Sequence, residues 1–340
     1  MPHFLGSLFG WSAAEPGRLP PALIDAAIER AVDGTDRRLR ALGKYRKRLR
    51  APVATAVQHV IELIDALPPV VEMTPGNYGS DPRLRMAFVS PDHLNDTLTR
   101  FWTVRDYLSS APRPLPDDIF GLLTMRQHEQ RVLGMELDGG LLKRDVLQTA
   151  VSFTDHQFLA PAAGERRTRR ELKRRAFDFL LSRAKEELLA AKASRSDLVK
   201  QRRQLRSELE TLETGEGRRP SRGAGSPPAD AGFLQAQIHA IDAELGPFGK
   251  AGLSLEDSLR RLETVLGEPQ AWLSLRTVRL SLDYRGIRRD EEGADALPPV
   301  ELVEIASSDD FRRIVMLGRI PRVRFPIPAD VVKRGQAYLG

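Results

Sequence analysis

The sequence predicts an α+β fold in which an antiparallel coiled-coil helical hairpin is inserted into a mixed body of helices and β-sheet. Three observations lead to this prediction: a long heptad repeat in the middle of the chain, strand-like alternation on both sides of it, and helical spacing of apolar residues near the N-terminus. The expected parts are an N-terminal helical region (1–82), a discontinuous α+β body (83–160 and 270–340), and the hairpin (165–268) with a flexible tip (214–230).

The N-terminal helical region is predicted from its prolines and its apolar spacing. Pro20-Pro21 suits the first turn of a helix, where a missing backbone N–H is not needed, and apolar residues recur at helical spacing as far as Leu49. Pro52 marks the start of a second helix, which we expect to end at Pro68-Pro69. A loop rich in Pro, Gly and Asn follows from about Thr74 to Pro82.

The first half of the body combines short helices with strands. Arg83–Val89 reads as a short strand, and Ser90-Pro91 resembles the N-cap and first turn of a helix that continues to about Leu108. A further short helix is expected from Pro116 to Leu123. A β-hairpin with its turn at Asp138-Gly139-Gly140 follows, because apolar and polar residues alternate on both sides of that turn.

The strand signal returns after the heptad repeat. The alternation over Leu273–Leu282 changes phase by one residue, which predicts a β-bulge. Val300–Ile305 is a second candidate strand, and Arg313–Leu317 is a third. This last segment is continuously apolar from Ile314 on, so we expect it to be buried on both faces of a sheet.

The heptad repeat provides its own test of an antiparallel hairpin. In facing antiparallel helices, the numbers of paired residues have a constant sum, and Leu205 with Ile238 and Leu198 with Leu245 both give 443. Gly246-Pro247 interrupts the returning helix, yet Leu188 with Leu255 again gives 443 beyond this break. The register therefore resumes as two facing arms require. The segment between the arms, GEGRRPSRGAGSPPA, is too rich in Gly and Pro to remain helical.

Composition limits the class of protein. The chain has 340 residues and 41% hydrophobic content, which is enough for a sizeable core, but no apolar run is long enough to span a membrane. It contains no Cys, which excludes disulfides and thiolate metal sites and is compatible with the cytoplasm, where we expect the protein to be. The formal net charge of +6 is a modest excess that does not by itself identify a nucleic-acid-binding protein.

Basic residues form the candidate binding surfaces. On an ideal helix, one group of five falls within a single sector, and a second group lies at the root of the predicted hairpin. The first group is Arg37, Arg40, Lys44, Lys47 and Arg48; the second is Arg166, Arg167, Arg169 and Arg170. Such surfaces contact phosphate backbones or anionic lipids. The alternative is that acidic residues elsewhere in the chain neutralise them.

Motifs for catalysis and for metal or cofactor binding are not found. The six histidines show no metal-ligand spacing, and no phosphate-binding loop, dinucleotide-binding or nucleophile-elbow motif is present, so we expect no metal and no cofactor. Asp92-His93 and Asp155-His156 are two adjacent acid–histidine pairs. The sequence does not say whether the regions of His93 and His156 converge into a site.

Three functional hypotheses follow, and the first is preferred. It is a non-enzymatic interaction or scaffold protein that binds a protein partner through the coiled-coil arm, because a protruding arm offers a long repetitive surface without catalytic residues. The second is an accessory protein that contacts the phosphate backbone of nucleic acid, or another anionic surface, through the basic helices. The third is an enzyme with an unrecognised site. A homodimer formed by exchange of the arm is an open alternative for the oligomeric state.

Overall fold

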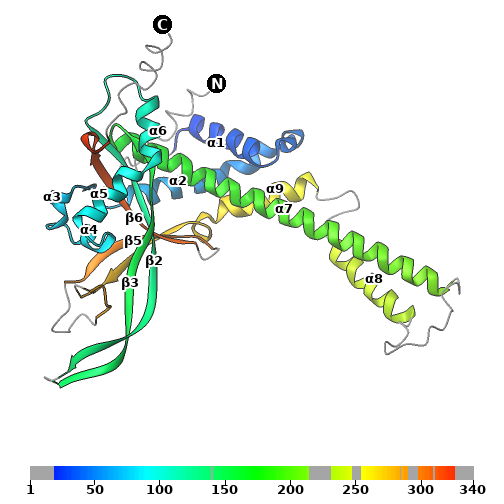
Figure 1. Cartoon of the computed structure of the whole chain (residues 1–340). Coiled ribbons are helices and arrows are strands. Elements are labelled where there is room, and N and C mark those ends of the chain that lie inside the picture. The colour runs from blue at the N-terminus through cyan, green and yellow to red at the C-terminus, as the bar shows by residue number, and fades with distance from the viewer. Residues whose placement is uncertain are drawn as a thin grey trace, which may run out of the picture. The chain divides into compact units, whose positions relative to one another are not determined.

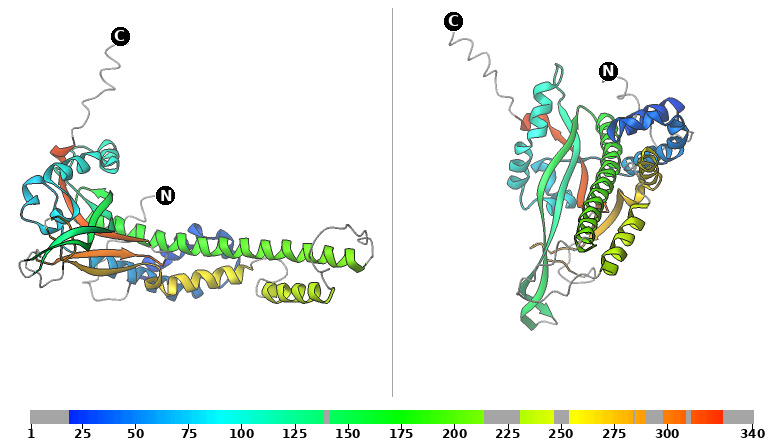
Figure 2. Two further views of the ribbon diagram at one scale, coloured as in Figure 1. Left: turned by 60° about the horizontal axis from the view of Figure 1, so that its bottom comes forward. Right: turned by 90° about the vertical axis from the view of Figure 1, so that its right-hand side faces the viewer.

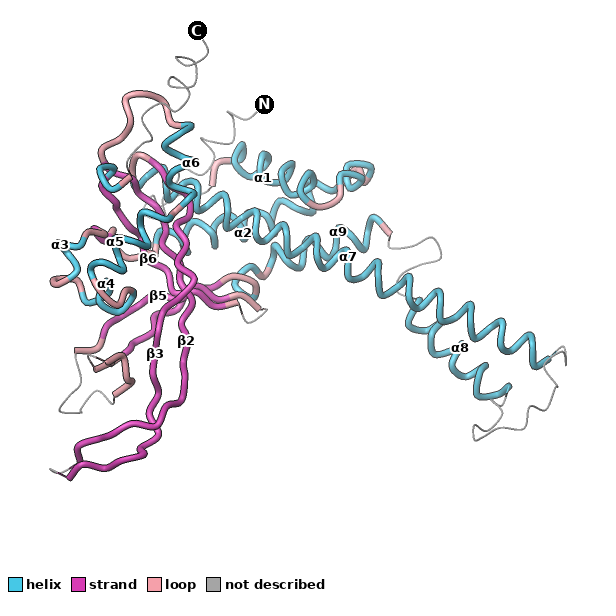
Figure 3. The backbone as a smooth tube through the Cα atoms, viewed as in Figure 1, coloured by secondary structure: helices cyan, strands magenta, loops and turns pink. Residues whose placement is uncertain are grey.

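The computed structural model describes residues 19–325 apart from 139–140, 214–230, 247–253, 284, 290–297 and 309–310. It contains helices and a largely antiparallel sheet, which confirms the α+β class (Figures 1 and 3). The predicted flexible tip (214–230), the hairpin turn at Gly139-Gly140 and the proline at the predicted helix break lie outside the described residues.

The described chain forms two compact units. Unit 1 consists of Gln58–Phe177 and the described residues from Gln270 on, and unit 2 consists of Leu19–Val57 and the described part of Asp178–Pro269. Residues 19–57 therefore group with the heptad region, whereas residues 58–82 group with the sheet.

Unit 1 is built on a six-stranded sheet whose main path has the order β3-β2-β6-β5-β4. The strands are β1 (Val71–Glu72), β2 (Asp118–Asp138), β3 (Leu141–Ala162), β4 (Ser274–Leu280), β5 (Val300–Ala306) and β6 (Arg312–Pro321). All neighbours on the main path are antiparallel, and β1 pairs with β6 in parallel. Strands from before and after the heptad region thus share one sheet, joined where β2 pairs with β6.

The central strand β6 has the burial that its composition predicts. Residues Ile314–Gly318 are buried without interruption, so both faces of the sheet are covered there. One face packs against the short helices that precede β2, since Ile314 and Met316 share a core cluster with Leu94 and Leu98. These helices are α3 (Pro75–Tyr78), α4 (Pro82–Ala87), α5 (Pro91–Arg100) and α6 (Trp102–Ser110).

Two element predictions in this region are wrong. Residues 83–89 were predicted as a strand but mostly form α4, because Asp81 caps the helix by accepting a hydrogen bond from the backbone N–H of Arg83, and Pro82 occupies the first turn. The segment from Pro116 to Leu123 was predicted as a helix, whereas from Asp118 on it is the first part of β2. Pairing with β6 decides the conformation of this segment.

The N-cap prediction at Ser90 is confirmed, since its side chain accepts a hydrogen bond from the backbone N–H of His93 (3.0 Å). The helix predicted to continue to Leu108 is divided at Phe101, whose backbone is extended, into α5 and α6. The loop expected from Thr74 to Pro82 also contains the single turn α3.

The predicted β-hairpin is confirmed but is much longer than its alternating pattern indicates. Only Asp118–Met125 of β2 pairs with β6, and from Arg126 on β2 pairs with β3 alone (Figure 3). An isolated bridge joins the other edge of β3 to the chain after β4, between Ala150 and Ile287. The bulge predicted in Leu273–Leu282 is wrong, because β4 pairs with β5 residue for residue over its whole length. Of the seven residues of β4 only Leu280 is buried, and the others are partly buried or exposed, so the alternation along β4 does not identify a single face that packs against the core.

Unit 2 is helical. Its elements are α1 (Pro21–Gly34), the 3-10 helix η1 (Arg37–Ala41), the first part of α2 (Tyr45–Asp65), most of α7 (Glu165–Glu213), α8 (Ala231–Leu245) and α9 (Leu255–Gly267). The short 3-10 helices η3 (Pro269–Ala271) and η4 (Arg322–Arg324) complete the described elements. Pro52 does not start a helix as predicted; it lies inside α2, which begins at Tyr45.

The heptad residues of α7 and α8 pack together. Leu205, Leu234, Ile238, Ile241 and Leu245 form one buried cluster, with Leu198, Val199 and Leu209 packed against it. Across the two helices, Arg202 donates a hydrogen bond to Asp242 (2.8 Å). In both views of Figure 2, α8 and α9 lie alongside α7. The residues of the predicted pairs Leu205–Ile238 and Leu198–Leu245 therefore lie in this cluster or pack against it.

Candidate functional site

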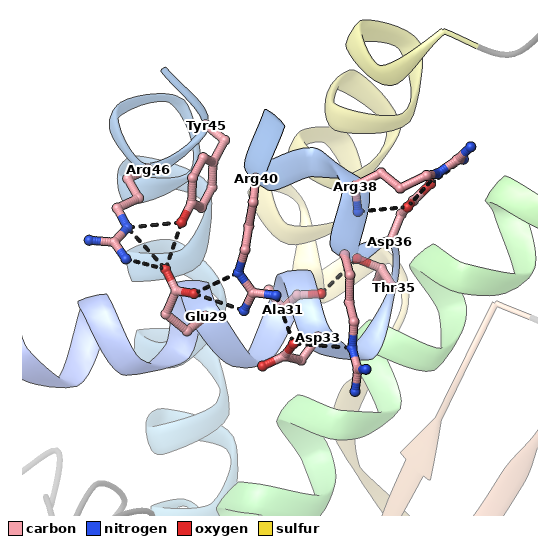
Figure 4. Close-up of polar contacts among 10 residues, drawn as sticks. Glu29, Ala31, Asp33, Thr35, Asp36, Arg38, Arg40, Tyr45 and Arg46 are labelled. Atoms are coloured by element: carbon pink, nitrogen blue, oxygen red, sulfur yellow. Dashed lines mark hydrogen bonds and ion pairs between the residues drawn. The ribbon is translucent and has the colours of Figure 1, made fainter. Parts of the chain in front are cut away.

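Two of the five residues in the first predicted basic group, Arg37 and Arg40, pair with acidic residues of α1. Arg40 contacts Glu29 (2.9 Å) and Asp33 (3.0 Å), as Figure 4 shows. Arg37 also pairs with Asp33. Burial raises the pKa of Glu29, but hydrogen bonds from Arg40 and Tyr45 outweigh this effect and hold its pKa below the ordinary value. The hydrogen bond from Arg40 likewise lowers the pKa of Asp33. These carboxylates stay ionised, so the two arginines are neutralised within unit 2.

Arg48 has a structural role that the sequence does not reveal. Its guanidinium pairs with Glu263 of α9 (2.6 Å) and with Glu256, about two turns earlier on the same helix. Both carboxylates raise the pKa of Arg48 above its ordinary value, with the hydrogen bond to Glu263 as the largest cause. Arg48 therefore holds the N-terminal part of α2 against α9 and does not present a free cation to solvent.

The second group of predicted basic residues, at the start of α7, also contains both paired and unpaired cations among the described residues. Arg169 pairs with Glu165 (2.7 Å) and donates hydrogen bonds to the carbonyl oxygens of Ile64 and Leu67 at the end of α2. Arg170 is partly buried, and its Nε has no hydrogen-bond partner among the residues that the structure describes. Of the nine predicted binding residues, Lys44, Lys47, Arg166 and Arg167 are exposed and make no ion pair with any residue that the structure describes.

Helix α8 presents a second apolar face. Its buried face is the leucine and isoleucine row against α7, while Phe233 has 59% of its surface exposed. Ala236, Ala240 and Ala243 are also exposed and follow Phe233 at intervals of three, four and three residues. At 100° per residue, these four side chains occupy a sector of about 80° opposite the buried row. We call this set of four residues the outer seam of α8.

Two histidines that are distant in sequence meet in unit 1. The rings of His93 (α5) and His156 (β3) are nearly perpendicular, with centroids 5.9 Å apart, and the ring of Phe88 stacks on His156 at 4.8 Å. His156 Nε2 lies 2.8 Å from the carbonyl oxygen of Ala87, which only accepts hydrogen bonds, so Nε2 carries the proton. Burial is the main cause that lowers the pKa of His156, which favours its neutral form.

A pocket of about 480 Å³ lies beside His156. The end of α5 and the start of α6 supply one wall, and residues 156–159 of β3 supply the other. Arg100, Trp102 and Gln157 are among the side chains that line the pocket. No aspartate or glutamate is among the described residues that line the pocket, although Asp155 lies next to His156 in β3. The two histidines thus converge.

Within the described residues, no group of three or more His, Asp or Glu side chains is arranged to hold a metal ion. Among the described helices, none combines the length and the apolar character needed to cross a lipid bilayer. No family model, no curated protein and no solved structure matches this chain.

Proposed function

We propose that this protein is a non-enzymatic interaction protein that binds a helix of a partner protein through an antiparallel coiled-coil arm formed by α7 and α8. The observation that carries the proposal is the outer seam of α8. A helix that is apolar on both sides is normally enclosed by other elements, whereas among the described residues α8 is covered on one side, by α7. The uncovered side needs a second contact to remove Phe233 from water.

The spacing of the outer seam selects the kind of partner. Intervals of three and four residues match the ridges and grooves of another α-helix, and alanine allows two helix backbones to approach closely. Phe233 at one end then supplies the single large side chain that anchors the contact. Gln237 and Glu244 flank the seam on one side and His239 on the other, which gives it a polar rim.

A photo-crosslinking experiment in cells tests this function. A photoreactive residue in place of Ala240 should form an adduct with one defined protein chain, and Phe233→Glu should abolish the adduct by placing a charge in the contact. The matched control is Gln235, which is exposed on the same helix but outside the seam. A crosslinker at Gln235 should give no adduct, and Gln235→Glu should leave the Ala240 adduct intact.

The identity of the adduct distinguishes the partners. An adduct of two copies of this chain, together with a dimer in solution that Phe233→Glu dissociates, would establish a homodimer. An adduct with a different protein would establish a scaffold for that protein. Absence of any adduct at Ala240, with a crosslinker of proven reactivity, would refute the proposal.

With no cysteine to oxidise, the protein needs no oxidising compartment, and we propose that this contact forms in the cytoplasm.

Nucleic-acid binding is the second candidate, because Lys44 and Lys47 remain unpaired among the described residues. They are one turn apart at the start of α2, where the helix dipole disfavours a cation and favours a bound anion. Phosphate oxygens would supply such an anion. The absence of paired acids distinguishes these lysines from Arg40 and Arg48, which are already neutralised.

Charge reversal tests this second candidate. The double variant Lys44→Glu/Lys47→Glu should weaken binding to duplex DNA or RNA and reduce its salt dependence, with the fold intact because neither lysine has an ion partner among the described residues. Binding that is absent in the unmodified protein even at low salt, or that is unchanged in the variant, would rule out this role.

A further inference from the structure

The pocket beside His156 contains two side chains that the fold does not explain. Trp102 has 73% of its surface exposed although it opens α6, so it contributes little to the core. Arg100 is exposed and makes no ion pair or hydrogen bond with any residue that the structure describes. A large aromatic face and an unpaired guanidinium therefore lie at the same pocket.

The pocket wall on β3 is shaped by two irregularities of the backbone. Asp155 (φ 52°) and Ala160 (φ 53°) are left-handed although neither is glycine, and they flank the four residues 156–159 that line the pocket. The register of β3 against β2 shifts at both places. Bulges of this kind redirect side chains, and strained backbone gathers at functional sites.

Specific contacts hold this wall in place. Arg313 of β6 binds Asp155 through its carboxylate (2.5 Å) and its carbonyl oxygen (3.1 Å), which fixes the first bulge. Thr103 of α6 donates a hydrogen bond to the carbonyl oxygen of Phe158 (2.6 Å), which ties the opposite wall to β3. The pocket is thus a defined feature of unit 1, formed by β3, α5 and α6.

His156 contributes a hydrogen-bond acceptor, because its contact with Ala87 determines which ring nitrogen carries the proton. Its Nε2 proton is donated to Ala87, so the remaining ring nitrogen, Nδ1, carries a lone pair. His156 itself lines the pocket. In its neutral form this nitrogen can accept a hydrogen bond from an N–H or O–H group, and Arg100 is the charged side chain among the described residues that line the pocket.

We propose that this pocket binds a small anion that carries a flat aromatic ring, with the ring against Trp102 and the anionic group at Arg100. Stacking on tryptophan suits flat rings, and a guanidinium binds carboxylate or phosphate through two parallel hydrogen bonds. The volume of about 480 Å³ lies within the range for small-molecule sites. This inference concerns unit 1 and goes beyond the proposed function of the arm.

Binding assays with matched probes test the proposal. AMP and benzoate represent the two sources of this chemistry, an aromatic phosphate and an aromatic carboxylate; adenosine and benzamide are their uncharged counterparts, and inorganic phosphate lacks the ring. Calorimetry should detect binding of at least one of the two anionic aromatics to the full-length protein. The affinity of its uncharged counterpart, and that of phosphate, should be at least about tenfold lower. The preferred probe identifies the source.

Two variants and one control locate the binding. Trp102→Ala and Arg100→Ala should each weaken the preferred probe about tenfold or more, whereas Arg131→Ala, an exposed arginine of β2 that does not line the pocket, should have no effect. The ring signals of His156 in an NMR spectrum should shift on binding. Three outcomes would overturn the proposal. Both anionic probes could fail to bind at about millimolar concentration, or the uncharged counterparts could bind equally well. The third outcome is an effect of Arg131→Ala equal to that of Arg100→Ala.

Discussion

At the scale of single residues, the backbone of β3 contains a strain that a substitution can measure. A left-handed conformation costs a non-glycine residue about 1–2 kcal/mol, and Ala160 adopts it inside the core, at 2% exposure. We therefore expect Ala160→Gly to leave the free energy of unfolding unchanged or to raise it by up to about 1 kcal/mol, since relief of strain offsets the entropy cost of glycine.

Ala162, two residues further along β3, provides the matched control. It is also buried, at 8% exposure, but its φ angle is ordinary. Ala162→Gly should therefore lower the free energy of unfolding by about 1 kcal/mol, because only the entropy cost and the lost methyl remain. Chemical denaturation of the two variants measures the difference, and equal destabilisation by both would contradict the strain at Ala160.

Asp283 is the clearest source of pH-dependent stability. Its buried carboxylate accepts hydrogen bonds from the backbone N–H groups of Arg285 (2.8 Å) and Ile287 (3.0 Å), and it pairs with Arg289 (3.1 Å). Burial raises the pKa of Asp283, but these contacts outweigh it and hold the pKa below its ordinary value. Its contribution is therefore complete above about pH 4 and is lost as the pH falls through the folded-state pKa.

The variant Asp283→Asn tests this contribution. It should lower the free energy of unfolding at pH 7 by about 2–3 kcal/mol, because the amide cannot replace a charged acceptor of several hydrogen bonds. The difference between variant and parent should shrink as the pH is lowered below about 4. Urea denaturation at a series of pH values measures it, and a difference that is constant down to acid pH would show that the charge of Asp283 is not the cause.

The basic residues illustrate what sequence can and cannot predict at this scale. The periodicity of Arg37–Arg50 predicts several cations on the surface of one helix, but the structure divides this segment into η1 and α2, and the neutralisation of these cations depends on partners remote in sequence. Arg48 and Glu263 are 215 residues apart. No local pattern assigns such a pair, so Arg48 and Lys47 look alike in the sequence and differ only in the fold.

At the scale of elements, local signals succeeded where they were complete. Ser90 was identified as an N-cap, and the continuous apolar run of β6 was identified as a doubly covered strand. The same capping signal at Asp81-Pro82 was overlooked, which is why α4 was predicted as a strand. The start of β2, from Asp118 on, could not be predicted locally, because its conformation depends on pairing with a strand about 200 residues away.

The contact of α2 with α9 offers a prediction at this scale. Arg48→Ala removes two ion pairs that join these helices and should lower the free energy of unfolding of unit 2 by about 1–2 kcal/mol, since the guanidinium is about one-third exposed. Lys47→Ala, its neighbour without an ion pair in the described chain, should have an effect below about 0.5 kcal/mol. Helix content followed by circular dichroism during denaturation measures both, and equal effects would argue against the role of Arg48.

At the scale of the whole molecule, segments that are remote in sequence are brought together. Alternating segments before and after the heptad region were expected to build one sheet, and β2 does pair with β6 across that long interval. Tertiary packing also groups α1 and η1 with most of α7, as the ion pair between Arg30 and Asp178 (2.5 Å) illustrates. Continuity in sequence alone does not predict such groupings.

Each unit has its own apolar cluster, and this has a measurable consequence for unfolding. The cluster of unit 1 joins the sheet to α4–α6, and the cluster between α7 and α8 belongs to unit 2 alone. The sequence ranges of unit 2 contain no tryptophan, whereas Trp102 and Trp272 belong to unit 1. Tryptophan fluorescence therefore reports on unit 1, and far-ultraviolet circular dichroism reports on helices of both units.

The variant Ile241→Asp separates the two signals. Placing a carboxylate in the cluster between α7 and α8 should detach α8 and shift the circular dichroism transition to lower denaturant concentration by an amount equivalent to about 3 kcal/mol. The fluorescence transition should stay where it is in the unmodified protein, because the core of unit 1 is unchanged. Ala243→Asp, on the exposed side of the same helix, should shift neither transition. If both signals move together in Ile241→Asp, the two units unfold as one cooperative structure, and their cores are energetically coupled through the helices that they share.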